Sequence, residues 1–227
     1  MKYSEFEHIM SEARMSRYLN ACCGDKRKAM ALYKLNLRLS QELFTVISCF
    51  EVALRNAIDS NCTDRLGADW LRDAAASGGI FNNKKCKLSE SNISDAVLKL
   101  NRSYTHSKLV AEMGFGFWRF MFAQHQYSAT GQALLKIFPA KPKSTPSFQY
   151  NNTYVFNQLA LINDLRNRIA HHEPVCFQIK SHKKETTYAR QHYVMIRQLF
   201  QWMCIDESSL LSGLEHVNAI CDQIDIL

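Results

Sequence analysis

The stretch LINDLRNRIAHHEP, residues 161–174, decides how this chain folds. Leu161, Leu165 and Ile169 recur every fourth residue, so they form an apolar stripe along one side of a helix. The closing proline lacks a backbone N–H and pushes the residue before it out of the helical region, so we expect the helix to end near Glu173. The pattern therefore predicts a packed helix whose C-terminal end carries polar side chains.

Four of these polar residues, Arg166, Asn167, His171 and His172, can carry chemistry. We expect both histidines in the last turn, where the negative end of the helix dipole favours a protonated imidazole. At about 100° per residue, Asn167 and His171 lie about 40° apart, whereas Arg166 and His171 are about 140° apart. Either the long arginine stem curls round the helix, or two copies of the helix meet. The second solution predicts a two-fold dimer.

The same residues carry a family resemblance. Arg166, Asn167, three further residues and His171 resemble the arginine-to-histidine signature of the HEPN superfamily, and RNRIAHHEP is similar to its Abi-like branch, proteins of bacterial abortive-infection phage defence. The stretches FEVALRNAI (50–58) and LVAEMGFGFWRFMF (109–122) match as well. With EHIMSEARMSRYL and ALYKLNLRLS, the resemblance spans most of the first 175 residues.

The resemblance implies an all-α fold, a single HEPN-type helical bundle over residues 1–227, and a homodimer that cuts RNA without metal or other cofactor. In the implied mechanism His171 moves the proton while the RNA 2′-OH attacks the adjacent phosphorus. Arg166 neutralises the charge on the phosphate, and Asn167 orients one phosphate oxygen. His172 is a spare proton-transfer group, because an arginine-to-histidine gap of either four or five residues fits the family.

A second helix carries Glu51, Arg55 and Asn56 beside its apolar stripe. On spacing alone, Glu51 and Arg55 form an ion pair one turn apart, worth a few tenths of a kcal/mol. The resemblance suggests another role, in which Glu51 or Asn56 holds Arg166 and Asn167 in place. Both interpretations stay open.

A function without catalysis is the alternative. The same basic helical dimer could hold a structured regulatory RNA, or a partner protein such as an antitoxin, without cutting. Other enzyme classes find little support, because the sequence has no phosphate-binding glycine loop, dinucleotide fingerprint, zinc-protease motif or nucleophile elbow. With few acidic residues near the motifs, a two-metal nuclease is disfavoured.

Composition agrees with a globular protein, and its basic charge fits either a polyanion partner or the mild basicity that many cytosolic proteins have for solubility. The chain has 227 residues, 47% of them hydrophobic, and a net charge of +7. The segment Asp206–Leu227 holds five acidic and no basic side chains, so the remainder is more basic still. No apolar run approaches the ~20 residues of a membrane span, and the N-terminus has no signal-peptide pattern. We expect a cytoplasmic protein without a membrane partner.

Several further features give local expectations. Residues 5–19 are expected to form one helix, Asp25 to cap a helix that starts at Lys26, Ser40 to open another, and residues 209–226 to form an acidic C-terminal helix. The eight cysteines lack C-x-x-C spacing and are expected to be free, several of them buried. The aromatic cluster 115–122 could stack bases, but its density favours core.

Two basic clusters stand apart from these motifs. One consists of Lys84, Lys85 and Lys87, and the other is the run Lys180–Lys184. Such runs are more often solvated surfaces than docking sites, and the sequence does not say whether either lies near the histidines.

Overall fold

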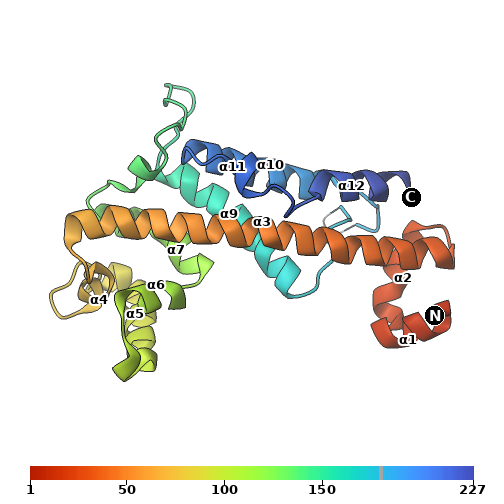
Figure 1. Cartoon of the computed structure of the whole chain (residues 1–227), viewed down its shortest axis with the longest axis horizontal. Coiled ribbons are helices and arrows are strands. Elements are labelled where there is room, and N and C mark those ends of the chain that lie inside the picture. The colour runs from red at the N-terminus through yellow and green to blue at the C-terminus, as the bar shows by residue number, and fades with distance from the viewer. Residues whose placement is uncertain (179–180) are drawn as a thin grey trace. The chain divides into compact units, whose positions relative to one another are not determined.

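The computed structural model describes residues 1–178 and 181–227, and the regular elements in these ranges are helices (Figure 1). The all-α expectation is confirmed; the only strand-like pairs there are isolated bridges, Thr145 with Phe148 and Phe177 with Lys184. The α-helices are α1 (Tyr3–Met10), α2 (Glu12–Ala21), α3 (Lys26–Leu66), α4 (Trp70–Ala75), α5 (Lys87–Leu100), α6 (His106–Glu112), α7 (Phe115–Phe120), α8 (Gln124–Ala129), α9 (Asn152–Ala170), α10 (Thr187–Trp202), α11 (Glu207–Leu210) and α12 (Val217–Ile226). Short 3-10 turns are η1 (Lys84–Cys86), η2 (Asn101–Ser103) and η3 (Leu134–Ile137).

The chain divides into two compact units, each built from separate stretches of sequence. The first unit consists of Met1–Ser48, Asp164–Gln198 and Asp206–Leu227, and the second of Cys49–Asn163 and Leu199–Ile205. The long helices α3 and α9 contribute residues to both. A single domain over residues 1–227 stays a prediction.

Helix α3 begins as expected but does not stop where expected. Asp25 caps its start, because Oδ1 accepts the backbone N–H groups of Arg27 (2.9 Å) and Lys28 (3.1 Å). The expected break at Ser40 is wrong, since α3 runs on to Leu66. The buried residues Leu39 and Leu43 keep the same spacing on both sides of the serine, so one apolar stripe continues. The packing of this stripe outweighs the lower helix propensity of serine, which costs roughly half a kcal/mol relative to alanine.

The N-terminal segment forms two helices instead of the one expected over residues 5–19. The chain turns at Ser11, which has a φ of +73°, and its hydroxyl accepts the N–H of Arg14 to cap α2. Helix α2 then buries Tyr18, whose ring packs against Tyr33 of α3 (5.0 Å) and edge-on against Phe177 (5.1 Å). The segment after α9 is thereby anchored in the core of the first unit.

The buried side chain of Asn36 fixes the same segment from α3. Its Oδ1 accepts the N–H groups of Val175 (2.9 Å) and Cys176 (3.2 Å). Both amides would otherwise be buried without an acceptor, because this segment is not helical. The position of the chain just beyond α9 is therefore held by specific contacts to α2 and α3.

The predicted acidic helix 209–226 is wrong, because α11 ends at Leu210 and α12 begins only at Val217. Gly213 has a φ of +72°, which no helix accepts, and Glu215 accepts the N–H of Val217 to restart the helix. The acidic residues of α12 are paired with α10, since Arg190 donates to Asp222 (2.6 Å) and Asp225 (3.0 Å).

In the second unit, α5 packs against α4 and α6 (Figure 1). Asp59 of α3 ties this group together, because its Oδ1 accepts from Trp70 Nε1 and pairs with His106 Nε2, each at 2.7 Å. The aromatic cluster is core, as expected, with Phe115, Phe117 and Trp118 buried. Phe120 is the exception.

Within the described residues, none of the helices combines the length and apolarity that a bilayer crossing demands. Of the run Lys180–Lys184, Lys180 lies outside the described residues, whereas Lys84, Lys85 and Lys87 are exposed.

Candidate functional site

Helix α9 ends at Ala170, three residues before the expected position. The N–H of His172 bonds to the carbonyl of Ile169 (3.0 Å), and the N–H of Glu173 reaches back to the carbonyl of Arg168 (2.8 Å). This pair of bonds is the Schellman closure of a helix. The proline therefore does not set the end; the chain has already reversed at His172.

His172 occupies the left-handed position of this closure, with a φ of +57°. Glycine is the usual residue there, because a side chain costs about 1–2 kcal/mol in this conformation. His171 is the last residue with a helical hydrogen bond, from its N–H to the carbonyl of Asn167 (2.9 Å). Both histidine side chains are exposed and lie just beyond the helix instead of in its last turn.

Arg14 of α2 holds this turn from outside. Its Nη1 donates to the carbonyl oxygen of His172 over 2.7 Å. Among the described residues no backbone N–H reaches this carbonyl, so the guanidinium satisfies an oxygen that would otherwise face solvent. The position of the histidine turn thus depends on a residue near the N-terminus.

A hollow of about 410 Å³ opens at this junction in the first unit. Six of the residues that line it are Arg14, Arg17, Tyr18, His171, His172 and Glu173. Two guanidinium groups and two imidazoles, against the one carboxylate of Glu173, therefore border one concave surface. Such a surface favours an anion, and arginine matches the geometry of phosphate oxygens.

The two arginines differ in how freely they could meet a ligand. Arg17 is engaged, because its Nη2 donates to the carbonyls of Gln178 (3.4 Å) and Ser181 and its guanidinium lies 4.4 Å from the centre of the Phe177 ring. Arg14 is exposed, and among the described residues its side chain makes one hydrogen bond, to His172. Arg14 is therefore the better placed of the two to contact a bound anion.

Arg166 and Asn167 do not line this hollow. Both are half-buried, and the Nε of Arg166 is buried without a hydrogen-bond partner among the described residues. The structure thus brings His171 and His172 together with Arg14 and Arg17, but not with Arg166. This separation agrees with the wide angle between Arg166 and His171 expected from the helical repeat.

The predicted supporting residues belong to the other unit. Glu51, Arg55 and Asn56 lie in the second unit, whereas Arg166 and Asn167 lie in the first. Their role in holding Arg166 and Asn167 stays a prediction.

Arg168 is a site residue that sequence reasoning missed. Its Nη2 donates to the carbonyl of Pro174 (2.7 Å), its Nε donates to Glu173 (3.3 Å), and its guanidinium lies 4.6 Å from the centre of the Tyr188 ring. It clamps the chain that leaves the histidine turn. Arg14 and Arg17 were also missed, although their spacing of three residues placed both on one face of a helix.

No group of three or more His, Cys, Asp or Glu side chains is arranged to hold a metal ion within residues 1–178 and 181–227. That the chemistry needs no metal stays a prediction.

Comparison with known proteins gives one match. The family described as Abi-like protein matches residues 2–176, a range that contains all six named residues of the hollow. No curated protein matches the chain, and no solved structure does.

Proposed function

Because the chain belongs to the Abi-like family of abortive-infection proteins, a branch of the HEPN superfamily, we propose that it is an endoribonuclease of phage defence with His171 as its proton-transfer group. The observation that carries the proposal is the position of His171. It is exposed at the rim of a hollow that also presents the guanidinium of Arg14. A positioned imidazole contributes typically about 10²–10⁴-fold to a proton-transfer reaction.

The reaction is an internal transfer of phosphate. His171 takes the proton of the RNA 2′-OH, and the 2′ oxygen forms a bond to the adjacent phosphorus. The bond from phosphorus to the 5′ oxygen of the next nucleotide breaks, and that oxygen takes up a proton. The products are a 2′,3′-cyclic phosphate and a 5′-OH end. Arg166 neutralises the charge on the phosphate oxygens and Asn167 orients one of them.

A homodimer would complete the site. Arg166 does not border the hollow that His171 of the same chain borders. Two chains that meet at the ends of their α9 helices would place Arg166 of one copy close to His171 of the other. We expect such a two-fold assembly, with RNA bound across it.

A non-catalytic module remains the second candidate, and one observation favours it. Arg17 is already bound to main-chain carbonyls, and Arg166 does not line the hollow, so one chain alone presents a basic surface without a complete catalytic set. In this case the protein holds a regulatory RNA or an antitoxin and does not cut.

One experiment separates the two candidates. Purified protein is incubated with total RNA in excess EDTA, beside His171→Ala and the matched control His8→Ala, an exposed histidine of α1 outside the hollow. If the protein is an enzyme, wild type and His8→Ala both cut the RNA, and His171→Ala does not. A protein that binds RNA and leaves it intact is the binding module.

A mixture of variants tests the dimeric site. Arg166→Ala and His171→Ala are each expected to be inactive alone, because each lacks one group in both copies. After mixing and subunit exchange, mixed dimers carry one site with both groups, so part of the activity returns. Activity that stays absent in the mixture, although light scattering shows dimers, contradicts a site shared in this way.

A further inference from the structure

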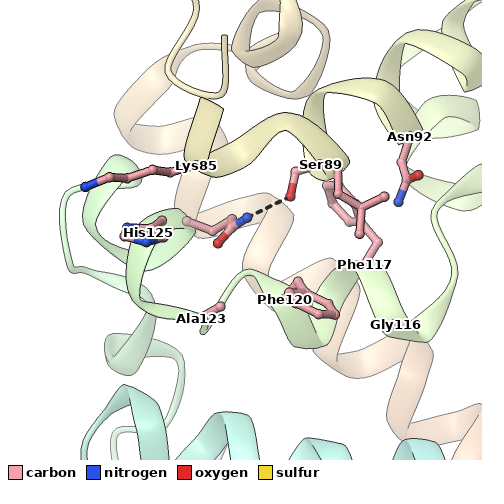
Figure 2. A pocket seen from close by; sticks show the side chains of 10 residues that line it. Lys85, Ser89, Asn92, Gly116, Phe117, Phe120, Ala123 and His125 are labelled. Carbon is pink, nitrogen blue, oxygen red and sulfur yellow. Dashed lines mark hydrogen bonds between the residues drawn. The ribbon is translucent and has the colours of Figure 1, made fainter. Parts of the chain in front are cut away.

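A second concave site lies in the second unit, away from the histidine turn in sequence. It is a pocket of about 420 Å³ between η1, α5, α7 and α8 (Figure 2). Volumes of about 300–1,000 Å³ are typical of pockets that bury small ligands. The features that matter are two aromatic rings, Phe117 and Phe120, a buried amide, Gln126, and two basic groups, Lys85 and His125.

The aromatic side chains make the walls. Phe117 is buried, whereas Phe120 is 37% exposed although it belongs to the aromatic core segment. Phe120 is held edge-on by Phe156, at 5.6 Å between ring centres. Gly116 adds no side chain beside them, and the nearest atom to a Cβ placed there is Asn163 Oδ1, at 3.9 Å. The guanidinium of Arg119 lies over the Phe120 ring, 5.1 Å from its centre, so a flat ligand ring would stack on the other face of Phe120.

The polar groups are few and incompletely used. Gln126 is only 6% exposed, and its Nε2 donates to Ser89 Oγ over 3.0 Å. Among the described residues no donor reaches its Oε1, and the side chain of Asn92 makes no hydrogen bond. A carbonyl oxygen and the remaining amide hydrogen of Gln126 are thus free, which is the donor and acceptor pair that the edge of a nucleobase requires.

The basic side chains of the pocket lie at one end of it. Figure 2 shows Lys85 and His125 on one side of the pocket and Asn92 on the other. A second hollow shares Asn92 with this pocket and is bordered by Asp95, Lys99 and Glu112, where Lys99 is paired with Glu112 at 2.6 Å. An anionic group of a ligand is therefore favoured only at the end near Lys85, whose ammonium has no ion-pair partner among the described residues.

We propose that this pocket binds one unpaired nucleobase, stacked on Phe120 and hydrogen-bonded to Gln126, with the attached phosphate at Lys85. Aromatic stacking accepts any base, and the amide selects among their edges. The site gives the basic cluster Lys84–Lys87 a function: Lys85 borders the pocket, while Lys87 is paired with Glu90 at 2.6 Å. The base can come from a free mononucleotide or from a single-stranded segment of RNA.

The inference goes beyond the proposed function and does not depend on cleavage, so it is tested in protein that carries His171→Ala and leaves RNA intact. Calorimetry measures the binding of the four ribonucleoside monophosphates, a single-stranded RNA 12-mer, inorganic phosphate and dodecanoate. The test variants are Phe120→Ala, Gln126→Met and Lys85→Glu. Lys84→Glu is the matched control, because it makes the same change of charge outside the pocket.

We expect at least one mononucleotide or the 12-mer to bind more tightly than phosphate. Phe120→Ala should weaken that binding at least about fivefold, as loss of one stacked base does. Lys85→Glu should weaken it as well, and Lys84→Glu should leave it within about twofold. If the mononucleotide binds and the 12-mer does not compete, the ligand is a free nucleotide; if only the 12-mer depends on Phe120, it is a base within RNA.

Two results overturn the inference. One is the absence of any nucleotide or RNA binding that Phe120→Ala weakens. The other is dodecanoate that binds more tightly than every nucleotide and loses affinity in Phe120→Ala, which marks a pocket for aliphatic anions. Because Gln126→Met could disturb packing, a thermal midpoint is measured for each variant, and Phe120→Ala decides if Gln126→Met unfolds. A negative result in this binding experiment does not contradict RNA cleavage at His171, which is tested separately.

Discussion

Arg14 and His172 are 158 positions apart in the sequence, yet Arg14 Nη1 donates to the carbonyl oxygen of His172 over 2.7 Å. The contact joins the second helix of the chain to the turn that presents His171. The proposed catalytic group is therefore positioned by two elements, the end of α9 and the side chain from α2. Changes in α2 should act on the reaction without touching either histidine.

Arg14→Ala tests this dependence. We expect the free energy of unfolding to fall by about 1 kcal/mol, because an exposed charge-assisted hydrogen bond is lost. RNA affinity should fall and its salt dependence should become shallower by about one counterion, because a phosphate contact is removed. The cleavage rate should fall further than affinity, since the histidine turn loosens.

The matched control for Arg14 is Arg27→Ala. It removes the same charge from an exposed arginine whose side chain makes no hydrogen bond or ion pair among the described residues. Equal losses of cleavage in the two variants would reduce the role of Arg14 to bulk charge.

His172→Gly separates the conformation of the turn from chemistry. Glycine adopts a φ of +57° without strain, so we expect the variant to be more stable by up to about 1 kcal/mol. His172→Val should be less stable, because a β-branched side chain is strained there. If His171 alone moves the proton, His172→Gly cuts RNA at a rate within about twofold of wild type. Loss of cleavage in a stable His172→Gly protein would make His172 a participant.

His192 makes the stability depend on pH. Burial lowers the pKa of His192 from its usual value of 6.5, and the nearby Arg168 acts in the same direction, against the Tyr188 carbonyl and Asp164. As the pH falls through about 6.5, His192 takes up a proton in the unfolded chain before it does so in the folded protein. The contribution of neutral His192 to the free energy of unfolding is therefore fully present above about pH 6.5 and is lost as the pH falls below it.

The measurement compares thermal midpoints at pH 7.5 and 5.5. Wild type should lose more on acidification than His192→Phe, which cannot take up the proton. The same decrease in both proteins would show that other groups carry the acid sensitivity.

The free cysteines should differ sharply in reactivity. The thiols of Cys62, Cys86, Cys176 and Cys221 are buried, and burial raises the pKa of Cys176 to about 12. Cys23 and Cys204 are exposed. We expect brief treatment of native protein with iodoacetamide to modify Cys23 and Cys204 first, as mapped by mass spectrometry. Early modification of Cys176 would mean that the segment packed on Asn36 opens readily.

The helices could be predicted where one apolar spacing and one cap agreed, as at Asp25. The ends of helices are harder to predict. Ser40 has the sequence signal of a helix start, but Leu39 and Leu43 stay on one apolar stripe, so packing continues the helix through the serine. The breaks at Ser11 and Gly213 depend on a positive φ, which periodicity does not reveal.

Part of the candidate site could also be predicted from sequence. The histidines at the end of α9 could be predicted, because local sequence sets a helix terminus. Arg14 and Arg17 could not, because their partners are main-chain oxygens more than 150 positions away, which Tyr18 and Phe177 pack close by. The partners of Arg168 are local, but they lie in the non-helical turn after α9, where the helical repeat gives no positions. The phenylalanine pocket escaped prediction because the exposure of Phe120 is a property of its surroundings.

The central claim is that His171 carries the chemistry of RNA cleavage. The most direct measurement compares the rates at which wild type and His171→Ala cut one labelled RNA in excess EDTA, with equal binding verified beforehand. We predict that wild type cuts, leaving a 2′,3′-cyclic phosphate, and that His171→Ala is slower by at least about a hundredfold while its thermal midpoint is unchanged. A wild-type protein that binds but does not cut, or a His171→Ala protein that cuts at the wild-type rate, would contradict the account.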